Sequence, residues 1–188
     1  MDNQTTRDPV APPNRARATF ADADTSTAEL AVRFGETDSY FQIGADTELT
    51  DKFVTITNPF NPAFFLESQP NVQAERIGVF AQWRGAAGKA EFELGARVDS
   101  TNQSAGAPQV GAAVPMGPRG LAAAFAAADR ETRQTTVDAV VRTWLPLGDI
   151  TPRLTLARKE RVASLLERFG WLPTEASFGL ADGSIYLG

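Results

Sequence analysis

Polar and apolar residues alternate along several stretches of this 188-residue sequence. In residues 28–34 and 41–46, one set of alternate positions is apolar, and the other contains the polar residues Glu29, Arg33, Gln42 and Asp46. Alternate residues of a β-strand point to the same face of a sheet. The polar residues that share one face by this rule are Glu29, Arg33, Gln42, Asp46, Glu48, Glu91, Glu93, Arg97, Asp99, Asp138 and Arg142. Such a face can bind a polar or charged ligand, or its side chains can pair with each other and remain solvated.

From this set we choose as candidate ligand-binding residues Arg33, Asp46, Glu93, Arg97, Asp138 and Arg142. The sequence contains no cysteine and no histidine, which excludes thiol catalysis, Ser-His-Asp triads and histidine-based zinc sites within this chain. Glu91 and Glu93 share a strand face, but a solvated face explains them without catalysis. We therefore expect no enzymatic activity and no cofactor.

The net charge of −5 argues against a nucleic-acid partner. No stretch approaches the roughly 18 apolar residues of a membrane-spanning helix, although alternating strands of an outer-membrane β-barrel also cross a membrane. Residues 1–15 are polar, rich in proline and without a secretory signal. A membrane-barrel interpretation therefore expects preceding residues that this sequence does not include.

The pattern predicts a loop over residues 1–14 and strands over 15–34, 39–49, 76–83, 90–100, 135–145 and 150–159. An alternative divides the first strand at Asp22-Ala23-Asp24. Short turns are predicted at 35–38, 85–88 and 146–149, and long loops at about 50–74 and 101–133. Within the second loop, the alanine-rich residues 120–128 favour a short helix.

Short turns alternate with long loops along the predicted chain. Structureless loops of this length are uncommon in compact soluble domains, whereas outer-membrane barrels combine short periplasmic turns with long external loops. Phe34, Phe41, Trp83 and Phe92 flank the first two short turns on the apolar face, as expected of an aromatic girdle; Trp144 has the opposite parity. A soluble β-sandwich shares the alternation and remains an alternative.

The end of the sequence carries a more specific signal. It contains Ala157-Arg158-Lys159-Glu160-Arg161, then Trp171-Leu172-Pro173-Thr174-Glu175-Ala176 and Gly179-Leu180-Ala181-Asp182-Gly183. These segments resemble the barrel sequence of a TonB-dependent outer-membrane receptor. Residues 76–83 and 94–99 resemble other barrel strands of that family, and Met1-Asp2-Asn3 resembles an external loop in its copper-receptor branch.

The resemblance implies an all-β fold, an antiparallel meander that forms about six strands of a 22-stranded transmembrane barrel with long extracellular loops and one short loop helix. Residues 1–188 would be a partial barrel domain without plug, TonB box or C-terminal strands. The implied function is energy-coupled uptake of a metal ion, a metal chelate such as a siderophore, or a similar small nutrient across the outer membrane of a Gram-negative cell. The implied partners are the TonB protein, acting through the missing plug region, outer-membrane lipid and the transported ligand.

Copper is one implied ligand, and thioethers select Cu(I). Met1 and Met116 are the only methionines and so the only candidate metal ligands of this type. Because no histidine or cysteine accompanies them, another metal chelate or small nutrient remains open.

Three interpretations remain: a receptor barrel segment, a soluble β-sandwich that binds a ligand, and a β-protein that self-assembles through open edges. An open six-stranded sheet leaves two unpaired edges, and its apolar face promotes aggregation in water. We therefore expect that the chain alone does not transport.

Overall fold

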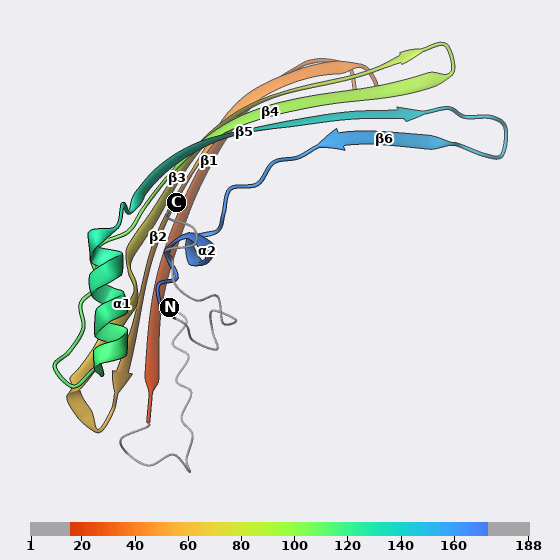
Figure 1. Cartoon of the computed structure of the whole chain (residues 1–188). Helices are drawn as coiled ribbons and strands as arrows, with labels where there is room; N and C mark the ends of the chain where they lie inside the picture. Colours follow the sequence, from red (N-terminus) through yellow and green to blue (C-terminus); the bar gives the residue numbers. More distant parts are fainter. Residues whose placement is uncertain (1–15, 173–188) are drawn as a thin grey trace.

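The computed structural model describes residues 16–172, which form one open antiparallel sheet and two small helices (Figure 1). The strands follow each other in sequence order across the sheet. They are β1 (Ala18–Gly35), β2 (Tyr40–Asn58), β3 (Asn61–Ala87), β4 (Ala90–Ser104), β5 (Glu131–Trp144) and β6 (Arg153–Arg158); the helices are α1 (Met116–Ala127) and α2 (Leu165–Phe169). The predicted all-β antiparallel meander is confirmed, and β1 is one undivided strand.

The three predicted short turns are present at one end of the sheet, which we call the turn end. Each contains a glycine with positive φ: Gly35 at 111°, Gly88 at 64° and Gly148 at 65°. Glycine adopts this conformation without the steric cost that a Cβ atom imposes. Short strand connections are therefore built into the sequence at these three places.

The three turns are staggered along the strand direction. The last pairs before them are Gly35–Tyr40, Ala87–Ala90 and Leu147–Ile150. Through the continuous register, the second pair lies three residues beyond the first, and the third lies two residues beyond the second. At a rise of about 3.4 Å per residue, the combined offset is about 17 Å, and it accumulates over four strand spacings of about 4.8 Å each. The strands therefore lean by about 40° from the perpendicular to the line that joins the three turns.

The prediction of a long loop over about 50–74 is wrong. β2 and β3 continue through this region and join in a tight turn between Asn58 and Asn61. Asn58 Oδ1 accepts a hydrogen bond of 2.8 Å from Phe60 N. Register shifts between Lys52 and Thr55 disturb the alternation, because each bulge reverses which face the following residues occupy.

The second long connection is present but shorter than expected, since β4 extends to Ser104 and β5 begins at Glu131. α1 begins four residues before the expected helix at 120–128. Residues 109–113 hydrogen-bond to β3 where it extends beyond the end of β4: Gly111 N donates to Phe65 O at 2.7 Å and Ala113 N to Ala63 O at 3.0 Å. This connection therefore covers an otherwise unpaired edge of β3.

The buried core lies at the end of the sheet opposite the short turns, which we call the loop end. It contains Phe64, Leu66, Val72, Val114, Ala122, Phe125, Phe169 and Trp171. The rings of Phe125 and Trp171 are 6.4 Å apart, and Trp171 Nε1 donates to Glu67 O at 3.1 Å. The core thus joins α1, α2 and β3.

After β6, which is shorter than the predicted strand 150–159, the chain leaves the sheet edge. Residues 159–172, which we call the strap, run along the concave side of the sheet (Figure 1). The strap contains α2, which the sequence pattern did not predict. Within the described residues, no helix is long and apolar enough to cross a membrane. The predicted loop 1–14 and the motif residues from Pro173 onward lie outside the described residues.

The β2–β3 register predicts a specific cross-link. Thr57 and Phe65 are direct partners, so the double variant T57C/F65C should form an intramolecular disulfide on mild oxidation. The control T57C/L66C is shifted by one residue, which places the two side chains on opposite faces. Mass spectrometry of tryptic peptides measures the link. Equal cross-linking of both variants would argue for the long flexible loop instead.

Candidate functional site on the concave face

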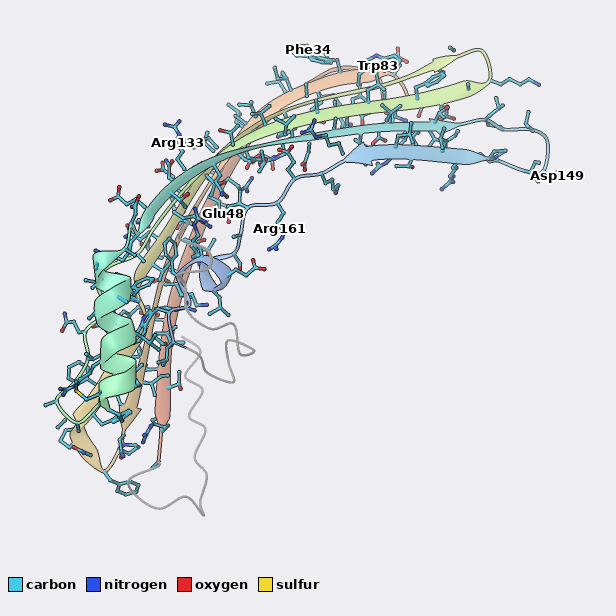
Figure 2. All side chains as sticks on the ribbon, viewed as in Figure 1. Phe34, Glu48, Trp83, Arg133, Asp149 and Arg161 are labelled. Atoms are coloured by element: carbon cyan, nitrogen blue, oxygen red, sulfur yellow. The ribbon has the colours of Figure 1, made fainter. Side chains whose placement is uncertain are left out.

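The two faces of the sheet differ in chemistry. Figure 2 shows Phe34 and Trp83 on the convex side and Glu48 on the concave side. One row of directly paired residues on the convex face is apolar on all six strands: Phe34, Phe41, Trp83, Leu94, Val141 and Leu156. All six are exposed. The charged residues selected from the sequence belong to the concave face.

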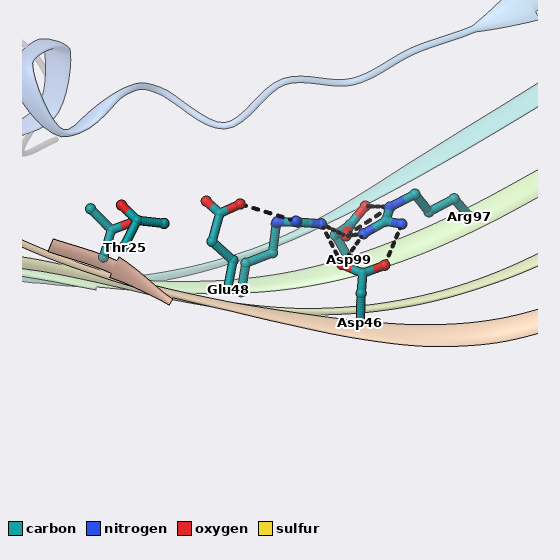
Figure 3. Close-up of polar contacts among 7 residues, drawn as sticks. Thr25, Asp46, Glu48, Arg97 and Asp99 are labelled. Atoms are coloured by element: carbon teal, nitrogen blue, oxygen red, sulfur yellow. Dashed lines mark hydrogen bonds and ion pairs between the residues drawn. The ribbon is translucent and has the colours of Figure 1, made fainter. Parts of the chain in front are cut away.

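Arg97 is the centre of an ion-pair network on this face (Figure 3). Its guanidinium donates to Asp46 from Nη1 at 2.6 Å and from Nη2 at 2.8 Å. It also donates to Asp99, from Nε to Oδ2 at 2.7 Å and from Nη2 to Oδ1 at 2.6 Å. Two bidentate pairs fix the plane of the guanidinium as well as its position.

A glycine creates the space for this guanidinium. Asp46 on β2 and Asp99 on β4 both pair with Gly78 on β3, so Gly78 lies between the two carboxylates. A Cβ atom added at Gly78 would lie 2.1 Å from Arg97 Nη2 and 2.5 Å from Asp99 Oδ1. Arg97 can therefore span the central strand only because residue 78 has no side chain.

Arg76 extends the network toward the loop end. Its Nη1 lies 2.9 Å from Asp99 Oδ1 and 3.0 Å from Asp46 Oδ1, and its Nη2 donates to Glu48 Oε2 at 3.3 Å. Two guanidinium groups thus bind three carboxylates. The side chains of Asp46 and Asp99 are only 11% and 12% exposed, so each carboxylate depends on its arginines to compensate for lost solvation.

The other candidate residues occupy separate positions on the same face. Arg142 Nη1 donates to Glu93 Oε1 at 2.7 Å. Arg33 donates to Gln42 Oε1 at 3.0 Å, and its guanidinium lies over the ring of Tyr40. Within each pair, the two side chains bind each other.

Asp138 has a different partner. Its Oδ1 accepts a hydrogen bond of 2.9 Å from the backbone N of Glu160 in the strap. Of the six selected residues, Asp46 and Arg97 meet in the central network, and a cavity of about 390 Å³ on the same face is lined by Glu93, Arg97, Asp138 and Arg142.

Sequence reasoning omitted three members of the network from the selected set. Glu48 and Asp99 carry the correct parity, so alternation alone identifies their face. Arg76 begins a predicted strand, and its parity places it opposite Glu48 once β2 and β3 are paired. Gly78 gives no signal of its own until the register is known.

Met116 lies at the start of α1, and the residue is 79% exposed. Met1 lies outside the described residues. In residues 16–172, no group of three or more acidic, histidine or cysteine side chains is arranged to hold a metal ion. The proposed role of either methionine in metal binding stays a prediction.

The strap has its own electrostatic structure. Ser164 and Glu167 form a capping box at the start of α2, and Arg161 donates to Glu167 Oε2 at 2.6 Å. The hydrogen bond from Arg161, followed by those from Ser164, lowers the pKa of Glu167 to about 2. Hydrogen bonds from Val137 N and Arg158 likewise lower the pKa of Glu160.

We compared the chain with protein-family models, curated proteins and solved structures. None of these comparisons found a match. The resemblance to TonB-dependent receptors therefore remains a sequence-based expectation.

Substitution at Gly78 should break the central network. In Gly78→Ala, the new methyl group displaces Arg97 from at least one carboxylate, which should lower the free energy of unfolding by roughly 1–3 kcal/mol. Gly120→Ala, in α1, is the control: no atom lies within 4 Å of the added Cβ, and the helix gains propensity. Denaturant unfolding in detergent measures both variants. Equal stability of Gly78→Ala and the parent would refute the requirement for glycine.

Acid should loosen the start of α2. Because the pKa of Glu167 is lower in the folded chain than in the unfolded chain, its contribution is complete above the unfolded pKa and is lost as the pH falls to about 2. The fluorescence of Trp171, measured with Trp83 and Trp144 replaced by Phe, should change over this interval. Glu167→Gln should remove that pH dependence; an unchanged titration in the variant would assign it to another group.

Proposed function

We propose that the chain is a wall segment of an outer-membrane TonB-dependent receptor, with its convex face toward lipid and its concave face toward the lumen. The observation that carries this proposal is the exposed apolar band on one face of a single-layer sheet. Soluble domains cover such a face with a second layer, whereas barrel strands direct it toward lipid.

The height of the band fits a membrane. On the convex face, the first row that is polar on all five long strands consists of Asp24, Asp51, Gln73, Ser104 and Glu131. In the preceding row of that face, only Leu49 is apolar. The fully polar row lies ten residues from the apolar row that contains Phe41 and Trp83. This separation is about 34 Å along a strand, so at a 40° tilt the apolar band is at most about 26 Å high along the membrane normal, which is comparable with the roughly 25 Å band of outer-membrane barrels.

The strand tilt supports the same interpretation. Closed barrels require strands that lean by about 35–45° from the barrel axis, and the stagger of the three short turns corresponds to about 40°. The turns then lie along one membrane surface. Phe34, Phe41 and Trp83 lie next to them on the convex face, where interfacial aromatic residues are enriched.

The concave face supplies polar groups but no catalytic arrangement among the described residues. Transport in such a receptor consists of binding, plug movement and release, without bond chemistry. The expected ligand is a metal ion, a metal chelate or a similar small nutrient, and the expected partner is TonB through a plug region. This part of the proposal rests on the sequence resemblance, and the receptor requires further strands to close the barrel.

Quenching by brominated detergent or lipid tests the orientation of the sheet. In single-tryptophan variants, Trp83 on the convex face should be strongly quenched by brominated acyl chains, whereas Trp171 in the buried core should be protected. The two tryptophans are matched in chemistry and differ in location.

Equal protection of Trp83 and Trp171, together with a soluble monomer that unfolds cooperatively in water, would contradict the membrane proposal. That result would support the soluble β-sandwich alternative, with the convex face covered by another part of the protein.

A further inference from the structure

Three glycines occupy concave-face positions inside strands: Gly44 of β2, Gly78 of β3 and Gly95 of β4. The space at the first two is filled by neighbouring side chains. Phe80 Cζ would lie 2.5 Å from a Cβ atom added at Gly44, and the guanidinium of the central network covers Gly78. At Gly95, apart from the adjacent residues of the strand, only Val140 Cγ1 lies within 4 Å of an added Cβ, at 2.9 Å. The concave face is therefore open above Gly95.

This open space is the cavity of about 390 Å³, which we call the Gly95 cavity. Its centre is apolar, because the paired residues Gly95, Val140 and Ala157 form one row across β4, β5 and β6. Phe80 adds an aromatic ring from β3. The volume is at the lower end of the usual range for small-molecule sites. An apolar group of a ligand can therefore lie over Gly95.

Most of the charges around the cavity are compensated by ion pairs. Three of the four cations that line it are bound by carboxylates: Arg97 by Asp46 and Asp99, Arg142 by Glu93, and Arg158 by Glu160. The fourth cation, Lys159, is exposed and forms no ion pair with a described residue. Its donors are therefore available to a ligand.

Asp138 is the matching uncompensated anion. Within residues 16–172 no cationic side chain binds it; its Oδ1 accepts a hydrogen bond from the backbone N of Glu160. Its Oδ2 accepts no hydrogen bond from these residues and is not buried. Because Ala139 pairs with Arg158, the next position along the antiparallel register places Lys159 beside Asp138, although no salt bridge joins them. One unpaired charge of each sign therefore lines the cavity.

We propose that the Gly95 cavity binds a zwitterionic amino acid with a large apolar side chain, such as phenylalanine. The ligand's ammonium group donates to Asp138 Oδ2, and its carboxylate accepts from Lys159 Nζ. Its side chain lies over Gly95 beside Phe80. Such a ligand needs no net charge in the cavity, only one available charge of each sign. The inference deepens the proposed receptor function, and it rests on that function for the route by which the ligand arrives.

The test compares four ligands that differ by one group each: phenylalanine, alanine, phenylalaninamide and 3-phenylpropionate. Binding of each to the full chain in neutral detergent is measured by saturation-transfer NMR and calorimetry at about pH 6, where the amino group is protonated. Phenylalanine should bind most tightly. Alanine, which lacks the apolar group, should bind about tenfold more weakly. The amide and the propionate, which each lack one charge, should bind about three- to fivefold more weakly.

Two variants assign the charges. Lys159→Gln should weaken phenylalanine by about three- to fivefold and leave phenylalaninamide unchanged, because the amide has no carboxylate to lose. Asp138→Asn should weaken phenylalanine and leave 3-phenylpropionate unchanged, while Asn Oδ1 can still accept from the strap. The matched controls are Lys89→Gln and Asp149→Asn, which lie in the second and third short turns, outside the cavity (Figure 2). Neither should change the affinity for phenylalanine.

A third variant tests the open space itself. Gly95→Val places an apolar side chain in the cavity and should weaken phenylalanine by at least about tenfold, with little effect on alanine. Circular dichroism checks the fold of each variant. If Gly95→Val does not fold, the variants at Lys159 and Asp138 decide the result, because both residues are partly or fully exposed.

Equal affinity for the four ligands, or no binding of any, would overturn the proposal. Equal effects of Lys159→Gln and Lys89→Gln would do the same. Binding of phenylalanine without quenching of Trp83 by brominated lipid would uphold the cavity assignment and reject the membrane orientation. Quenching without binding would reject the cavity assignment alone, so the two proposals fail separately.

Discussion

A single-layer sheet has to bury its apolar face against something other than itself, and this constraint governs the rest of the structure. The ladder from β1 to β6 satisfies the backbone between strands, yet it gives the convex side chains no cover within the described residues. The hydrophobic core is confined to the loop end, where α1 and the strap meet β3. Over the remainder of the sheet, order depends on strand pairing and on side-chain contacts across the concave face.

The ion pairs of the concave face provide order that a hydrophobic core supplies elsewhere. Arg97 connects β4 to β2 across Gly78, and Arg76 connects β3 to both neighbouring strands. Exposed ion pairs contribute little stability individually, but Asp46 and Asp99 are largely buried and shared between two arginines. The network therefore fixes the register of three strands, while leaving other polar groups, such as Gln103, directed at the strap.

Much of the turn end was predictable, because strict alternation and three turn glycines determine strand direction, face and register there. The structure of the loop end was not predictable from these patterns. Bulges between Lys52 and Thr55 reverse which face the following residues occupy. The prolines at 59, 62 and 70 are typical of loops, although two of them lie within β3. Asp46 and Arg97 were identified from parity alone. Their convergence depends on Gly78, and the strap depends on distant contacts such as that between Trp171 and Glu67, which local patterns do not encode.

Because one edge of β3 is covered, a further strand can pair with the sheet only at its other edges. Residues 109–113 occupy the backbone groups of β3 beyond β4, so no further strand can be added at that position. At one outer side of the sheet, an incoming strand finds the 18-residue β1 as a template. The opposite side is divided between the 6-residue β6 and residues 131–138 of β5, which do not pair with β6. Strand exchange or templated polymerisation would therefore begin at β1, and the two ends of the meander are not equivalent partners for each other.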